Sequence, residues 1–144
     1  MPDILHSVTI KASPEAVYRA ITEPNGLRSW WTTDVEAEAA EGSLAVFRFE
    51  SGQAQMRMRV KSLSLTKGVR WLVEEPSPPE WKGTHVTWDL SEADSGTRVL
   101  FGHRDWKSTD KSFPFINYSW GYYLLSMVKY LEEGKGFPHD KPSR

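Results

Sequence analysis

The stretch that decides the fold is Phe113–Glu133, with the sequence FPFINYSWGYYLLSMVKYLEE. Its large apolar residues follow one another at intervals of four, four, three and four positions, which places them on one face of an α-helix: Ile116, Trp120, Leu124, Met127 and Leu131. Gly134 follows where a helix-terminating glycine is expected, and Pro138 lies shortly beyond it. The spacing therefore predicts a long amphipathic helix that buries this face against the rest of the chain.

The residues from Thr33 to Asp105 alternate between apolar and polar side chains, which is typical of strands that bury one face. We expect six strands there, at residues 33–38, 44–51, 54–65, 68–75, 83–91 and 96–105. Short turns that contain glycine separate several of these strands, and such connections favour an antiparallel meander. The predicted sheet thus has one polar face in water and one apolar face that needs a cover.

A seventh strand and two short helices are predicted before this region. Residues 4–11 alternate like a strand, and residues 13–15, Ser-Pro-Glu, have the cap, proline and carboxylate typical of a helix start. A second short helix is expected to begin at Pro24. The whole pattern predicts a single α+β domain over residues 1–144, in which a curved antiparallel sheet of about seven strands wraps around the long C-terminal helix.

Composition excludes several classes of function. Eighteen Lys and Arg residues against nineteen Asp and Glu residues give a net charge of -1, which disfavours a nucleic-acid binder. The absence of cysteine excludes disulfides, a thiol nucleophile and any cysteine-ligated zinc or iron–sulfur site. No apolar stretch approaches the length of about 18 residues that a membrane span requires. We therefore expect a soluble, cytoplasmic protein.

The histidines show no metal-binding spacing, so neither a metal nor another cofactor is expected. No nucleophile elbow and no phosphate-binding loop is present either. His103 lies on the apolar face of its predicted strand with Asp105 two residues on, so the two side chains are expected to share one end of a cavity. His103 could make a structural hydrogen bond, orient a ligand, or transfer a proton with help from Asp105.

Aromatic residues are abundant, with seven Trp, five Tyr and six Phe. Two features favour a cavity over a filled core: Asn117 and Gly121 interrupt the inner face of the long helix, and methionines make adaptable walls. Trp30 and Trp31 are adjacent, and one of them is expected to face inward. The candidate ligand-binding residues are Trp30, Phe47, Phe49, Met56, Met58, Trp71, Trp88, Phe101, His103, Asn117, Trp120 and Gly121.

Two further indoles, those of Trp81 and Trp106, lie in polar loops of the predicted fold. A tryptophan has a large apolar body and one polar N–H group, so such a position suits the mouth of a cavity or a surface that binds a partner. The sequence leaves open which of these two places each indole takes.

Several short motifs together resemble one known superfamily. They are Ala12-Ser13-Pro14-Glu15-Ala16-Val17, Val86-Thr87-Trp88-Asp89-Leu90, Gly96-Thr97-Arg98-Val99 and Trp120-Gly121-Tyr122-Tyr123-Leu124-Leu125-Ser126. On these motifs the chain resembles the START-like (SRPBCC) superfamily, and within it the branch named for the activator of the heat-shock-protein-90 ATPase. The resemblance covers essentially the whole chain and implies a helix-grip (START/Bet v 1-like) fold with a hydrophobic cavity between the sheet and the C-terminal helix.

A shared fold does not determine one function. The leading hypothesis is a binding protein for a small hydrophobic ligand, aromatic or lipid-like, held in the internal cavity. The first alternative is an enzyme similar to polyketide cyclases that transfers a proton through His103 and Asp105. The second is a co-chaperone-type interaction module, which the resemblance alone suggests and whose partner would be a chaperone ATPase. Assembly as a homodimer is left open.

Overall fold

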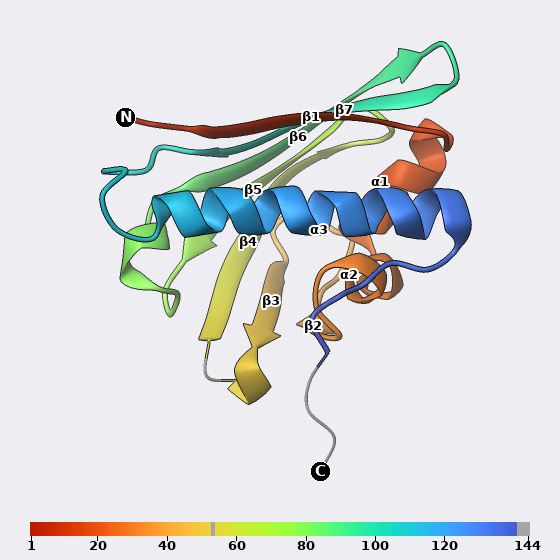
Figure 1. The fold of residues 1–144 in the computed structure, drawn as a ribbon. Coiled ribbons are helices and arrows are strands. Elements are labelled where there is room, and N and C mark those ends of the chain that lie inside the picture. The colour runs from red at the N-terminus through yellow and green to blue at the C-terminus, as the bar shows by residue number, and fades with distance from the viewer. Residues whose placement is uncertain (53, 141–144) are drawn as a thin grey trace.

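One antiparallel sheet of seven strands forms the body of the protein in the computed structural model, which describes residues 1–52 and 54–140 (Figure 1). The spatial order is β1-β7-β6-β5-β4-β3-β2, so consecutive strands from β2 to β7 are neighbours and β1 lies at the edge beside β7. The strands are β1 (Ile4–Ile10), β2 (Asp34–Glu36), β3 (Leu44–Phe49), β4 (Ala54–Ser64), β5 (Gly68–Glu74), β6 (His85–Ala93) and β7 (Gly96–Arg104). The predicted meander is confirmed.

The long helix α3 (Phe113–Glu133) crosses one face of the curled sheet, and the short helices α1 (Pro14–Thr22) and α2 (Pro24–Trp30) lie at one end of it (Figure 1). α1 begins where the sequence predicts, because the Ser13 hydroxyl accepts a hydrogen bond from the Ala16 N–H at 3.1 Å. α3 ends at Gly134, which adopts a left-handed φ of 87°. The predicted helix-grip α+β fold is therefore confirmed.

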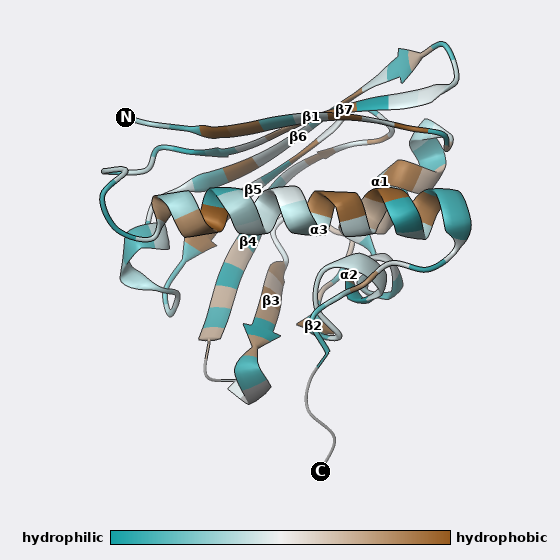
Figure 2. Ribbon diagram, viewed as in Figure 1, coloured by the Kyte–Doolittle hydropathy of each residue, from teal (hydrophilic) through white to brown (hydrophobic). Residues whose placement is uncertain are grey.

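Alternation of side chains separates the two faces of the sheet. Figure 2 shows hydrophilic and more hydrophobic residues alternating along β4. Met56 and Met58 of this strand are buried, and Arg57 and Arg59 occupy the alternate positions, which belong to the other face. On the outer face, arginines pair with carboxylates of the neighbouring strand, as Arg59 does with Glu74 at 3.0 Å. The inner face is apolar and is covered by α3.

Aromatic rings fill most of the space between sheet and helix. Trp120 of α3 stands at the centre of this core, with its ring centroid 4.4 Å from that of Phe101 and 4.8 Å from that of Trp31. Both Trp30 and Trp31 are buried, whereas the sequence predicted only one of them inside. The Trp30 indole is held because its N–H donates to the Ala20 carbonyl of α1 at 2.8 Å.

His103 of β7 is fully buried in this core and binds three elements together. Its Nδ1 accepts from the Trp120 indole N–H at 3.0 Å, and its Nε2 lies 2.8 Å from the Thr84 hydroxyl. The Thr84 hydroxyl donates in turn to the Trp81 carbonyl at 2.6 Å. Since Nδ1 is an acceptor, the proton of the neutral ring is on Nε2. Burial, together with the nearby His85, lowers the pKa of His103 to about 3.

The predicted sharing of a cavity end by His103 and Asp105 is wrong. Both ring nitrogens of His103 are bonded to other groups, and the exposed Asp105 carboxylate instead lies 2.8 Å from Nδ1 of His85. Asp105 follows the end of β7 with a left-handed φ of 72°, so its backbone has left the strand geometry that the prediction assumed. The pKa of His103 also lies far below the range in which a histidine transfers protons near neutral pH.

Truncation of Trp120 tests the packing of α3 on the sheet. We expect Trp120→Ala to lower the free energy of unfolding by about 3 to 5 kcal/mol, as for other large-to-small core changes. Asn117→Ala, at an exposed position of the same helix, is the control and should lower it by less than about 0.5 kcal/mol. Urea titration measures both, and equal losses would contradict the helix orientation.

The neutral, buried state of His103 makes stability depend on pH. The pKa of His103 in the folded state is below the value of about 6.5 expected in the unfolded chain, so the unfolded chain takes up a proton first as pH falls. This contribution to stability is present above about pH 6.5, and about 2 kcal/mol of it is lost between pH 7 and 5. Urea titrations at several pH values should show that loss of unfolding free energy in the wild type and a smaller loss in His103→Gln. If the unfolding free energies of the two proteins change with pH by equal amounts, the role of His103 is contradicted.

Candidate functional site

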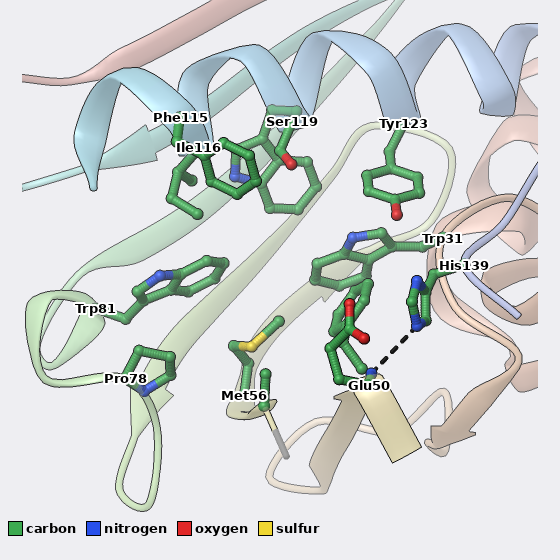
Figure 3. Close-up of a pocket in the computed structure, with 13 residues that line it drawn as sticks. Trp31, Glu50, Met56, Pro78, Trp81, Phe115, Ile116, Ser119, Tyr123 and His139 are labelled. Atoms are coloured by element: carbon green, nitrogen blue, oxygen red, sulfur yellow. Dashed lines mark hydrogen bonds between the residues drawn. The ribbon is translucent and has the colours of Figure 1, made fainter. Parts of the chain in front are cut away.

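A cavity of about 310 Å³ opens at one end of the core, beneath the first half of α3 (Figure 3). Its walls come from α3, from the ends of β3 and β4, and from the short helical turns η1 (Glu50–Gly52) and η2 (Pro79–Trp81). The lining residues that the structure describes are mostly apolar or aromatic: Trp31, Phe49, Glu50, Ala54, Met56, Pro78, Trp81, Phe115, Ile116, Ser119, Trp120, Tyr123 and His139. The volume is that of a small ligand site.

α3 supplies one wall because its lining residues recur with helical spacing, from Phe115 to Tyr123. Trp31, which caps the C-terminal end of α2, lies beside Trp120 on an adjoining wall, and Figure 3 shows its indole across from Trp81. Gly26 lets α2 approach α1, since a Cβ atom placed there would lie 2.6 Å from the Ala20 Cα. Contact between two short helices thus places one wall of the cavity.

The segment after α3 returns to close this side of the cavity. The His139 N–H donates to the Trp31 carbonyl at 2.8 Å, and the His139 carbonyl accepts from the Thr33 N–H at 2.9 Å. The His139 ring accepts the Glu50 N–H at Nε2, at 3.1 Å (Figure 3). His139 thereby joins α2, the start of β2 and η1. Its role in this wall has no signal in the sequence, because its partners are about 90 to 110 residues away.

Four polar groups face this apolar space: the side chains of Glu50, Ser119, Tyr123 and His139. Burial raises the pKa of the Tyr123 hydroxyl, and so, to a lesser degree, do the neighbouring Tyr122 and the charge of Glu50. The Tyr123 hydroxyl is therefore protonated at neutral pH and can donate a hydrogen bond. The cavity offers polar contacts at a few points only, as ligand sites in proteins commonly do.

The candidate residues from the sequence divide into three groups. Three of them line the cavity: Phe49, Met56 and Trp120. Seven are packed in the core behind it, where neighbouring rings fill the space: Trp30, Phe47, Met58, Trp71, Trp88, Phe101 and His103. The third group, Asn117 and Gly121, is on α3 but does not line the cavity. Asn117 is exposed, and a Cβ atom at Gly121 would make ordinary contact with His6 of β1, 3.6 Å away.

The two loop tryptophans take different places. Trp81 is buried and lines the cavity, in agreement with one of the two expectations. Trp106 is 1% exposed, so neither expectation holds for it. Its ring packs 4.7 Å from that of His103 and 5.7 Å from that of Phe113. The polar sequence around Trp106 gives no sign of this burial, because the contacts come from β7 and α3.

No cluster of three or more His, Asp or Glu side chains within the part of the chain that the structure describes could hold a metal ion. No helix in that part has the length and apolar character needed to cross a membrane.

The family model for activator of Hsp90 ATPase homolog 1-like proteins matches residues 11–132. The solution structure of the Aha1 dimer from Colwellia psychrerythraea is 36% identical, with a TM-score of 0.87 over 94% of this chain and 100% of that chain. A comparison with curated proteins found no match.

Two more distant structures share the fold alone. A protein from Staphylococcus saprophyticus is 19% identical, with a TM-score of 0.78 over 94% of this chain and 96% of that chain. CalU16 from Micromonospora echinospora is 16% identical, with a TM-score of 0.74 over 94% of this chain and 76% of that chain. The matched residues span most of the sequence, and the chain therefore belongs to the family of activator of Hsp90 ATPase homolog 1-like proteins.

Proposed function

We propose that this protein binds a small, largely apolar ligand in the cavity beneath α3. The observation that supports this most strongly is a space of about 310 Å³ whose walls include six aromatic side chains. That volume is at the lower end of the range of about 300 to 1,000 Å³ for ligand sites, so the ligand is small. No reaction is part of the proposal, because His103 and Asp105 do not line the cavity.

Two lining residues, Trp31 and Trp120, are fixed by contacts with the filled core, which favours a cavity that persists without ligand. The Trp31 ring lies 4.3 Å from Phe47 and stacks at 6.4 Å on Trp71, two rings of the filled core. The Trp120 indole is fixed by its hydrogen bond to His103. A cavity with preformed walls binds its ligand without a large ordering cost.

A substitution that fills the cavity tests the proposal. Ser119 is half-buried and faces the space, so Ser119→Phe should lower the affinity for the neutral aromatic probe N-phenyl-1-naphthylamine at least about tenfold, equivalent to 1.4 kcal/mol. Asn117→Phe adds the same ring to the exposed side of α3 and should change the affinity less than twofold. Titration of probe fluorescence measures both, and equal effects would contradict this site.

A specific surface feature favours a second function, self-association through α3. Its outer side exposes four large apolar or aromatic side chains at helical spacing, and no residue from 112 to 128 is charged. The exposed residues are Phe115, which also lies at the edge of the cavity, Tyr118, Tyr122 and Leu125, with exposed fractions of 46% to 73%. Interface cores are depleted in charge and enriched in aromatic residues. An uncharged face does not repel its own copy in a two-fold dimer.

We propose a homodimer in which the α3 helices of two chains meet along this face. The related Colwellia psychrerythraea protein was solved as a dimer, which supports this choice. A chaperone ATPase is the other partner that the same face would suit, as the family resemblance leads one to expect. The two partners differ in one simple respect, since only the homodimer forms in a sample of the pure chain.

Sedimentation velocity tests the homodimer. The wild type is expected at twice the mass of one chain, and Tyr118→Glu at the mass of one chain, because two carboxylates would meet in the interface. Leu65→Glu, in the equally exposed turn between β4 and β5, is the matched control and should stay dimeric. A monomeric wild type would contradict the proposal, and so would a Tyr118→Glu variant that remains a dimer.

A further inference from the structure

The described residues that line the cavity include a negative charge and no lysine or arginine to balance it. Among these described residues, Glu50 is the single carboxylate. The His139 ring, which also faces the cavity, accepts a hydrogen bond from the Glu50 N–H at Nε2 and is therefore neutral in this arrangement. The described lining thus has a formal charge of -1 with no cation to balance it.

Glu50 is held in a defined place at the start of η1. Its backbone adopts a left-handed φ of 53°, which is uncommon for a residue other than glycine, and its N–H is fixed by the His139 ring at 3.1 Å. Figure 3 shows its carboxylate directed into the cavity, on the side of Trp31 and below Tyr123. The charge is felt inside the cavity, since Glu50 contributes to the raised pKa of Tyr123.

Nearby basic side chains are engaged elsewhere. Arg48, two residues before Glu50 in sequence, pairs with Asp34 at 3.4 Å and Glu36 at 2.5 Å. Lys82, just after η2, pairs with Glu75 at 2.8 Å. Within the part of the chain that the structure describes, no ion pair includes Glu50. Its carboxylate is available to a ligand.

Aromatic rings complete the recognition of positive charge. Six aromatic side chains surround the space that Glu50 faces: Trp31, Phe49, Trp81, Phe115, Trp120 and Tyr123. The faces of such rings are negative and attract cations, most strongly where water is excluded, and tryptophan is the best of the three ring types. Glu50 is itself exposed, so an organic cation meets its carboxylate at the open edge of this space and the ring faces further in.

We propose that the ligand of this cavity is a small organic cation, an alkylated or protonated amine with apolar substituents. The positive group lies beside Glu50 and the rings, and the apolar substituents contact Met56 and Ile116. This inference rests on the ligand-binding function proposed above and specifies the class of ligand. An anionic ligand of the same size is disfavoured, because its charge would approach Glu50 without a compensating cation.

Two probes of nearly identical shape separate charge from apolar contact. Choline has a quaternary ammonium group, and 3,3-dimethylbutan-1-ol has a neutral carbon in place of the nitrogen. Isothermal titration calorimetry of the full chain is expected to give choline an affinity at least about tenfold higher than that of the alcohol. Equal affinities, or tighter binding of the alcohol, would overturn the cation inference.

Three variants test which residues cause the preference for choline over the alcohol. Glu50→Gln removes the charge and keeps the shape, so the affinity for choline should fall about fivefold to tenfold and that for the alcohol should stay the same. Glu92→Gln removes an equal charge from the exposed surface of β6, far from the lining residues, and should leave both affinities unchanged. Phe49→Leu keeps an apolar side chain without the ring and should lower only the choline affinity, about twofold to fivefold.

The outcomes separate this inference from the proposed function. If N-phenyl-1-naphthylamine binds as described above and choline gains nothing over the alcohol, the cavity binds ligands and the cation inference is overturned. If Glu50→Gln and Glu92→Gln lower the affinity for choline equally, the effect comes from the net charge of the protein, and the specific role of Glu50 is overturned. If neither the naphthylamine nor choline binds, both proposals are overturned.

Discussion

Every other feature of this protein depends on the contact that Trp120 makes between α3 and the sheet. Its indole packs 4.4 Å from Phe101 and 4.8 Å from Trp31, and its N–H donates to the buried His103 at 3.0 Å. The hydrogen bond fixes the rotation of the helix, because only one orientation presents the N–H to Nδ1. It also satisfies a polar atom that would otherwise be costly to bury. The position of Trp120 therefore sets which residues of α3 face inward and which face solvent.

That position explains why the core is full at the centre and open at one end. Behind Trp120, the ring of Trp88 packs against those of Trp71 and Phe101, at 5.8 and 4.8 Å, and these rings occupy the space that a ligand would need. In front of it, the small Ser119 and the exposed Glu50 at the start of η1 leave space, and the cavity remains. A ligand would thus be held at the end of the sheet beside η1, in contact with fixed rings. The filled centre and the open end are two consequences of one packing arrangement.

The sequence predicted the fold well because the fold depends on local and periodic signals. The spacing from Ile116 to Leu131, the start of α1 at Pro14 and the alternation along the strands all match the structure. The site was predicted less well. Residues expected in it, such as Trp88, share their apolar face with true lining residues, and periodicity cannot tell a packed ring from an exposed one. His139 and Glu50 were missed because their meeting depends on where the segment after α3 returns, which no local pattern encodes.

The most direct test of this account is the set of seven indole N–H signals in a proton–nitrogen NMR spectrum. During titration with N-phenyl-1-naphthylamine, we expect the signals of Trp31, Trp81 and Trp120 to shift in proportion to occupancy. Those of Trp71 and Trp88, which are packed in the filled core, should stay in place. Shifts that begin at Trp71 and Trp88, or that leave Trp31 and Trp81 unmoved at saturation, would contradict a cavity at the end of the sheet.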